Sequence, residues 1–191
     1  MIHKTAQTIL DTEHGTFDFV VYQDAAGKEH MALLKDWGDK VPLVRIHSEC
    51  ATGDLFASQF CDCGQQLEKG LEMIQREGGV MMYLRQEGRG LGLGKKIQAY
   101  ELQRQGMDTV EANLSLGRAA DEREYDLAIE MLKDLGVSSL KLLTNNPAKL
   151  EALQKAGMTC VQVPLDIPLT SERGVKYLRT KREKMRHTLS R

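Results

Sequence analysis

Several features are scarce in this chain of 191 residues, and each absence excludes a class of protein. No run approaches the roughly 18 apolar residues of a membrane-spanning helix, and the first residues lack the apolar core of a signal peptide. The formal net charge is only −1, which gives no overall attraction to nucleic acid or to an anionic membrane. We therefore expect a cytoplasmic protein with neither nucleic acid nor membrane as a partner, in which disulfides are uncommon.

Aromatic residues are also few, at 5% of the chain, but apolar residues reach 41%, which is enough for a core. The length suits one domain over residues 1–191, because no repeat, low-complexity segment or linker interrupts it. A disulfide framework of four cysteines would suit a much smaller secreted domain than this chain. A basic tail from about residue 172 is expected to be a solvated helix.

Residue patterns predict antiparallel strands first and strand–helix alternation afterwards. Alternation and turn residues predict strands over residues 16–23, 30–34, 42–47, 80–84, 139–143 and 160–163. Helical spacing predicts helices over 64–77, 93–105, 121–135 and 147–156, whereas 106–117 should be a polar connection. This order favours an α/β fold, an α/β/α sandwich with a mixed sheet whose parallel part is in the second half.

Three of the four cysteines, Cys50, Cys61 and Cys63, follow the pattern C-x10-C-x-C at the end of a predicted strand. Grouped thiolates suit zinc, which takes sulfur and nitrogen ligands in a tetrahedron. Three protein ligands leave one position open, as in a catalytic site, and a fourth would make the site structural. His47 is a possible fourth ligand, and buried free thiols are the alternative to any metal.

A glycine-rich turn (residues 85–94) follows a predicted strand and precedes a helix that begins with Lys95 and Lys96. Backbone N–H groups and cations arranged in this way suit an anion such as phosphate. The spacing matches neither a Walker A loop nor the dinucleotide fingerprint, and a plain turn would have the same pattern.

Several other residues have both a functional and a plain structural interpretation. Asp121 would cap a helix, and Arg123 in its first turn opposes the helix dipole unless an anion lies nearby. Tyr100 shares an apolar helical face and equally suits the core. Thr144 ends a strand and Lys149 opens the next helix, a position that lines ligand crevices in α/β sheets. The remaining histidines show no ligand spacing and are expected at the surface: His3, His14, His30 and His187.

GTP cyclohydrolase II is the family that this chain resembles, from about Gly15 to the tail, in the segments RIHSEC, CDCGQQL, RQEGRGLGL, DTVEAN, ADEREYDLA and LLTNNPAK. The resemblance implies the first committed step of riboflavin biosynthesis. In that step GTP is hydrolysed to a diaminopyrimidine ribosyl phosphate, formate and pyrophosphate. No dihydroxybutanone-phosphate synthase motif is seen, so the resemblance is to the stand-alone form, for which a homodimer is expected.

The resemblance also implies ligands for the metal and the substrate. It implies one Zn²⁺ per subunit, on Cys50, Cys61 and Cys63, and Mg²⁺ with the triphosphate. The positions that match GTP-binding residues of the family are Arg45, Ile46, His47, Ser48, Glu49, Gln66, Glu87, Gly88, Arg89, Thr109, Thr144 and Lys149. On this basis His47 contacts substrate and is no longer a reserve metal ligand.

Three residues match the catalytic positions of the family. Asp121 matches the proton acceptor, Arg123 the nucleophile toward the α-phosphate, and Tyr100 a tyrosine tied to ring opening. Because a guanidinium pKa exceeds about 12, electrostatic stabilisation of the phosphoryl group is a rival role for Arg123.

Two departures from the family pattern leave room for other activities. Lys95 stands where the family usually has Asn, and Arg186 where it has Gly. One alternative is a paralogue that stops at the formamide product or serves another pathway. Another is a zinc-stabilised nucleotide-binding protein without turnover.

Overall fold

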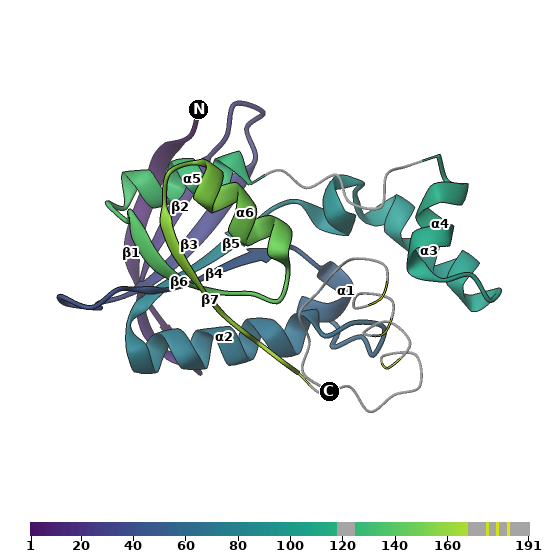
Figure 1. Ribbon diagram of the computed structural model, residues 1–191, viewed down its shortest axis with the longest axis horizontal. Helices are drawn as coiled ribbons and strands as arrows, with labels where there is room; N and C mark the ends of the chain where they lie inside the picture. The colour runs from purple at the N-terminus through teal and green to yellow at the C-terminus, as the bar shows by residue number, and fades with distance from the viewer. Residues whose placement is uncertain (118–124, 168–174, 176–178, 180–182, 184–191) are drawn as a thin grey trace.

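A computed structural model describes residues 1–117 and 125–167 and the single positions 175, 179 and 183. Its strands form one mixed sheet in the order β1-β2-β3-β5-β4-β6-β7 (Figure 1). The strands are β1 (His3–Thr12), β2 (Gly15–Gln23), β3 (Glu29–Lys35), β4 (Leu43–Ser48), β5 (Gly79–Leu84), β6 (Ser139–Leu143) and β7 (Thr159–Val163). The helices are α1 (Ala51–Asp54), α2 (Cys63–Glu77), the 3₁₀ turn η1 (Glu87–Gly90), α3 (Leu93–Arg104), α4 (Thr109–Ser115), α5 (Asp126–Asp134) and α6 (Pro147–Lys155).

The sheet changes direction at β5. The pairs β1–β2, β2–β3 and β3–β5 are antiparallel, whereas β4 runs parallel to both β5 and β6, and β6 runs parallel to β7. The predicted mixed α/β sheet, with its antiparallel strands first, is confirmed. The carboxyl ends of β4, β5, β6 and β7 consequently meet at one edge.

Helices cover both faces of this sheet, with α2 on one side and α5 and α6 on the other (Figure 1). Successive strand residues alternate between the two layers, because side chains of a strand point to opposite faces. Val44 and Met82 belong to the core cluster that includes α5 and α6, and their neighbours Leu43 and Met81 pack with Ile74 of α2. Burying each such side chain stabilises the fold by about 1.5–3 kcal/mol.

The predicted apolar stripe of α5 is confirmed. Tyr125, Ala128, Ile129 and Leu132 are all buried in the core cluster. The expected helix cap at Asp121 lies outside the described residues, as does most of the basic tail.

Three expectations were wrong or incomplete. Residues 106–117 contain helix α4, which begins with a reciprocal pair: the Asp108 N–H donates to Glu111 Oε2 at 2.9 Å, and the Glu111 N–H donates to Asp108 Oδ1 at 3.1 Å. This capping box stabilises a helix without apolar periodicity. Strand β1 was not predicted, because it is an exposed edge strand with no buried residue in its pattern. His30, expected at the surface, is buried.

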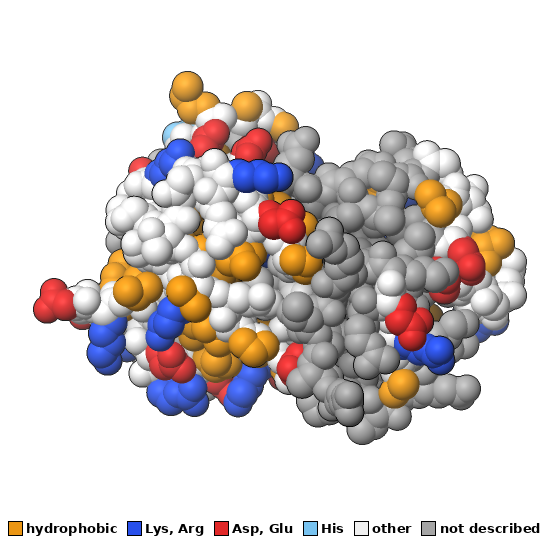
Figure 2. Space-filling view, in the orientation of Figure 1, with side chains coloured by type: hydrophobic (Ala, Val, Ile, Leu, Met, Phe, Trp, Pro, Cys, Tyr) orange, Lys and Arg blue, Asp and Glu red, His pale blue; other side chains and the backbone are white. Residues whose placement is uncertain are grey.

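Helices α3 and α4 extend past the edge where the parallel strands end (Figure 1). They pack on one another, and α3 also contacts η1. Basic and acidic side chains are interspersed over the described part of the face in Figure 2. Within the described residues, no helix has both the length and the apolar character needed to cross a membrane.

Candidate functional site

Three segments that carry predicted site residues lie where the parallel strands end. Residues 49–54 follow β4, the glycine-rich turn follows β5, and residues 144–149 follow β6. Because β4 runs parallel to β5 and β6, these three segments leave the sheet at the same edge. Ligand crevices of open α/β sheets lie in this place.

The three-cysteine cluster (Cys50, Cys61 and Cys63) is formed as predicted. The three sulfur atoms all lie within 4.8 Å of one another, and Cys50 Sγ is 3.6 Å from Cys61 Sγ. This separation excludes a disulfide bond between them, which requires about 2.05 Å. It is close to the ~3.8 Å expected for two thiolates on one tetrahedral zinc ion with bonds of about 2.3 Å. Among the described residues the grouping includes no histidine, so His47 is not a fourth member.

Two glycines allow the three cysteines to approach one another. A Cβ added at Gly53 would lie 2.9 Å from Cys61 Sγ and 3.1 Å from Cys50 Sγ, so a side chain there would fill the space between the thiols. A Cβ at Gly64 would collide with the carbonyl oxygen of Gly53. The first turn of α2 therefore rests directly on the backbone of α1. The space that Gly53 leaves open fits a metal ion.

The thiols share their protons unevenly. Hydrogen bonds from Cys61 and Cys63, together with the nearby Lys96 ammonium, hold the pKa of Cys50 well below its usual range. The hydrogen bond with Cys50, with burial, raises the pKa of Cys61 to about 11. A metal ion bound here would displace the remaining protons, because thiolates are the ligands.

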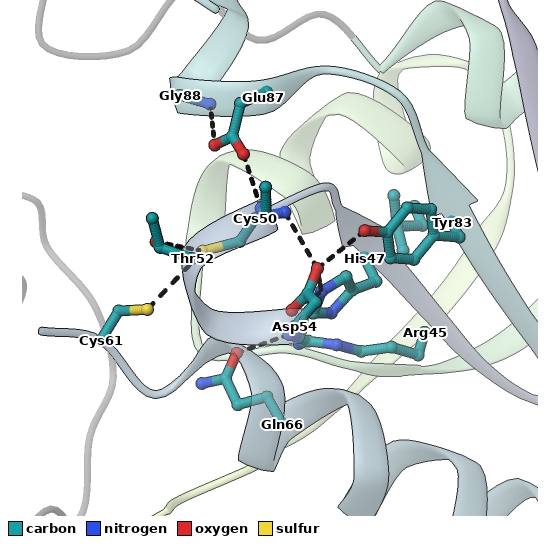
Figure 3. Close-up of polar contacts among 12 residues, drawn as sticks. Arg45, His47, Cys50, Thr52, Asp54, Cys61, Gln66, Tyr83, Glu87 and Gly88 are labelled. Atoms are coloured by element: carbon teal, nitrogen blue, oxygen red, sulfur yellow. Dashed lines mark hydrogen bonds and ion pairs between the residues drawn. The ribbon is translucent and has the colours of Figure 1, made fainter. Parts of the chain in front are cut away.

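Asp54 connects the cluster to β4 and β5. Its carboxylate accepts the Cys50 N–H at 2.9 Å and the Tyr83 hydroxyl at 2.9 Å, and it lies 3.1 Å from His47 Nε2 (Figure 3). The rings of His47 and Tyr83 stack with centroids 5.4 Å apart. Both the Asp54 and the His47 side chains are only 2% exposed, so this network is shielded from water.

His47 is neutral and has one ring nitrogen available. Burial, with the charges of Arg45 and Lys149, lowers the pKa of His47 against the opposite effect of Asp54. A neutral ring that donates from Nε2 to Asp54 carries its lone pair on Nδ1. In the described part of the chain, this buried Nδ1 has no hydrogen-bond partner. Such a group is costly unless a ligand satisfies it.

Glu87 anchors the glycine-rich turn to α1. Its carboxylate accepts the Ala51 N–H at 2.6 Å and the Gly88 N–H at 2.6 Å, and it pairs with Lys96 Nζ at 2.9 Å. Lys96 Nζ also lies 3.1 Å from Cys50 Sγ. Figure 3 shows Glu87 above Cys50, pointing toward the start of α1. The predicted Glu87 and Gly88 thus border the cluster.

Tyr100 of α3 also reaches the cluster. Its hydroxyl is 3.3 Å from Thr52 Oγ1, and its ring stacks on Phe60 with centroids 4.7 Å apart. Burial, with the negative charge of the cysteines, raises the pKa of Tyr100 well above its usual value. Tyr100 is therefore a protonated donor at neutral pH.

The side chains of the other predicted residues of β4, Arg45 and Ile46, point to opposite faces of the sheet. The Arg45 guanidinium donates to the Leu143 carbonyl at 3.1 Å and to Gln66 Oε1 at 2.5 Å. Gln66 in turn donates to Asp62 at 2.6 Å. The Ile46 side chain is part of the core, so only its backbone faces the site region.

Residues at the end of β4, and residues that follow β4 and β6, complete the edge. Ser48 Oγ accepts from Gln86 Nε2 at 2.9 Å, and Glu49 pairs with Arg85 at 3.0 Å. Lys149 is buried, and its Nζ donates to the carbonyl of Ile46 at 2.6 Å.

Thr144 closes the turn before α6. Its Oγ1 accepts the Asn146 N–H at 3.1 Å, and Asn146 caps α6 through Ala148.

Four predicted residues are described only in part or not at all. Arg89 lies in η1 and Thr109 begins α4, but only their backbone is described. Asp121 and Arg123 lie outside the described residues, so their roles remain predictions.

Sequence reasoning missed Asp54, Tyr83, Thr52 and the direct contact of Lys96 with a cysteine. Asp54 follows Cys50 by four residues, one helical turn, and this spacing was an available signal. The position of Tyr83 depends on the register of β4 against β5, which no local pattern specifies.

Comparison with known proteins identifies the family. The family model for GTP cyclohydrolase II matches residues 3–164. GTP cyclohydrolase-2 of Neisseria meningitidis is 48% identical over all of this chain and 98% of its own length. Riboflavin biosynthesis protein RibBA of Phocaeicola vulgatus is 46% identical over 99% of this chain, and that of Cytophaga hutchinsonii is 49% identical over 94%.

The chain spans about half the length of the RibBA relatives that it matches, 48% and 45% respectively. A solved two-domain 3,4-dihydroxy-2-butanone 4-phosphate synthase from A. baumannii is similar over 75% of this chain and 34% of its own. Its TM-score is 0.44 at 22% identity, too distant to support a structural argument. The family match and the sequence identities show that this chain belongs to the GTP cyclohydrolase II family.

Proposed function

We propose that the protein hydrolyses GTP at a zinc ion held by Cys50, Cys61 and Cys63. The guanine imidazole ring opens, formate and pyrophosphate leave, and a diaminopyrimidine ribosyl phosphate enters riboflavin biosynthesis. The observation that carries this proposal is the cluster of three thiols around the space at Gly53, at the edge where the parallel strands end. Zinc dependence stays a prediction from the cysteine pattern and the resemblance, and Mg²⁺ and the homodimer stay predictions from the resemblance. The single domain and the cytoplasmic location stay predictions from length and composition.

The donor set of the cluster supports zinc rather than a harder cation. Three sulfur ligands suit a soft or borderline ion, whereas Mg²⁺ and Ca²⁺ take oxygen. A zinc ion held by three thiolates would supply a Lewis acid with one position open toward the substrate. The remaining steps depend on groups of the chain itself.

His47 is the group we propose to hold the purine base. Its Nδ1 is buried with an unused lone pair, and Asp54 fixes the ring by accepting from Nε2. An N–H of guanine is a suitable donor to that lone pair. Binding would satisfy a nitrogen that otherwise has no partner among the described residues, which favours a base with a donor edge.

Tyr100 is the group we propose to give a hydrogen bond or a proton as the ring opens. Burial keeps the hydroxyl protonated at neutral pH, and the stack on Phe60 fixes the direction of the ring. Because its raised pKa makes Tyr100 a weak acid, a hydrogen bond to the opening ring is favoured over complete transfer of the proton.

The triphosphate is proposed to lie along residues 85–94 and the start of α6. Lys149 lies in the first turn of α6, and its ammonium already reaches across to the carbonyl of Ile46. Asp121 and Arg123 are proposed as the proton acceptor and the group that acts at the α-phosphate. A cation such as Lys149 beside the phosphates would stabilise the charge of the departing pyrophosphate.

Incubation of zinc-loaded protein with GTP and Mg²⁺, followed by mass spectrometry, tests the proposal. We expect formate, pyrophosphate and the deformylated pyrimidine, and Cys61→Ser should abolish all three. Tyr100→Phe should lower the yield of ring-opened product while leaving zinc content unchanged. An accumulating formylated product would instead support the paralogue. Intact GTP beside stoichiometric zinc would support the non-catalytic nucleotide-binding protein.

A further inference from the structure

Lys96 lies between two negatively charged groups at the edge of the cluster. Its Nζ is 3.1 Å from Cys50 Sγ and 2.9 Å from Glu87 Oε1, and the side chains of Lys96 and Glu87 are each only 10% exposed. The same Nζ lies 5.7 Å from the centroid of the Tyr100 ring. The order thiolate, ammonium, carboxylate alternates in charge through a region with little water.

The position of Lys96 is set by backbone packing as well as by charge. Gly88 adopts φ +61°, and a Cβ there would lie 3.2 Å from Lys96 Cβ, so the glycine-rich turn packs closely on the base of this side chain. Glu87, which pairs with Lys96, also accepts the backbone N–H groups of Ala51 and Gly88. The Glu87 carboxylate therefore holds both Lys96 and Ala51, the residue that follows Cys50.

The charge count of the occupied site calls for such a cation. Three thiolates on one Zn²⁺ carry a net charge of −1, and the Glu87 carboxylate adds a second negative charge nearby. A buried charge without compensation is strongly unfavourable. Partners that hydrogen-bond to metal ligands orient those ligands and modify their donor strength.

We propose that Lys96 is a positioning and charge-balancing residue of the metal centre, which donates a hydrogen bond to the Cys50 thiolate and separates it from Glu87. This inference rests on the proposed function, because it assumes a metal at the three cysteines. It assigns Lys96 to the metal and not to the phosphates, a role that its place beside the glycine-rich turn would otherwise suggest.

Cobalt(II) substitution tests the inference, because the thiolate-to-cobalt charge-transfer band reports directly on the sulfur ligands. Removing an N–H donor from a thiolate raises the energy of its lone pairs, so Lys96→Met should move this band to longer wavelength. Affinity for cobalt should fall by about 10- to 100-fold, the usual effect of losing such a partner. Lys96→Arg keeps a cationic donor and should retain most of both properties. It also serves as the second variant if Lys96→Met folds poorly by circular dichroism.

Two comparisons separate this role from a general loss of charge. Lys95→Met removes the same charge one residue away. Among the described residues Lys95 makes no hydrogen bond to the cluster, so the charge-transfer band and the cobalt affinity of Lys95→Met should match those of the wild type. Adding Glu87→Gln to Lys96→Met removes the carboxylate that would then face the thiolates, and should recover part of the lost affinity.

The outcomes are distinct. A wild-type protein without a thiolate band would overturn the proposed metal site and this inference with it. A normal wild-type band, combined with a Lys96→Met variant that behaves like Lys95→Met, would overturn the inference alone.

Discussion

Substitution of Gly53 by alanine is the sharpest perturbation of the cluster. The added methyl group would lie 2.9 Å from Cys61 Sγ, 3.0 Å from Cys63 Cβ and 3.1 Å from Cys50 Sγ. Ordinary contacts between heavy atoms are about 3.5–4.0 Å, so the cysteines would have to move by roughly 0.5 Å. Overpacking of this kind costs about 1–3 kcal/mol.

The cost should appear mainly as lost metal affinity. Without metal the thiols can rotate away from the methyl group, but three sulfurs tied to one ion cannot. If the strain falls on the metal-bound state, 1–3 kcal/mol corresponds to about 5- to 160-fold weaker zinc binding. Competition against a chromophoric zinc chelator would measure this, with thermal unfolding at saturating zinc as a second readout.

Gly94→Ala is the matched control. A Cβ at Gly94 meets no heavy atom of the described residues within 4 Å, and its backbone needs no positive φ. This variant should bind zinc as tightly as the wild type. If Gly53→Ala does the same, the space between the thiols is not where the ion binds, and the fit argued above is wrong.

Three further changes test other parts of the structure. Asp54→Ala removes the acceptor shared by Cys50, His47 and Tyr83, and should lower the free energy of unfolding by about 3 kcal/mol in urea titrations. Tyr83→Phe removes only one donor and should lower it by about 1 kcal/mol, so equal losses would contradict the shared network. Burial lowers the pKa of His30 in the folded protein, so the unfolded chain binds the proton more readily and the free energy of unfolding should fall as the pH drops below about 6.5. His30→Gln should make the free energy of unfolding depend less on pH between pH 7.5 and 5.5. An unchanged pH dependence would contradict this assignment to His30. Asn146→Ala removes the side-chain cap of α6 and should cost about 1 kcal/mol by the same titration, whereas no loss would show that the cap is replaced by water.

Local sequence patterns were sufficient for much of the fold and for the three-cysteine cluster. The alternation in residues 16–23 and the turn at Gly27 specify a hairpin, and the apolar stripe of α5 specifies one buried face. Cys61 and Cys63 are two residues apart and therefore lie close together in any fold. Each of these signals is contained in one short segment, and for this reason the sequence alone predicts the feature.

Features that depend on contacts between distant segments could not be read in this way. The Asp54 carboxylate meets His47 from β4 and Tyr83 from β5, and only the register between those strands brings them together. His30 is buried, and its Nδ1 accepts the N–H of Arg85, which follows β5 and is 55 residues away in the chain. Helix α4 was missed for another reason: a capping box was present, but no apolar periodicity pointed to it.

Helix α1 has a consequence for how an ion would bind at the three-cysteine cluster. A single turn of four residues is far too short to be stable alone, and its first amides would normally bond to water. Here Asp54 and Glu87 accept the N–H groups of Cys50 and Ala51, so hydrogen bonds within the chain hold the turn. Little conformational entropy then remains to be lost on binding, which is the physical meaning of a preorganised site. When an ion dissociates from such a site, the turn should keep its conformation, and a new ion should bind without refolding of the chain.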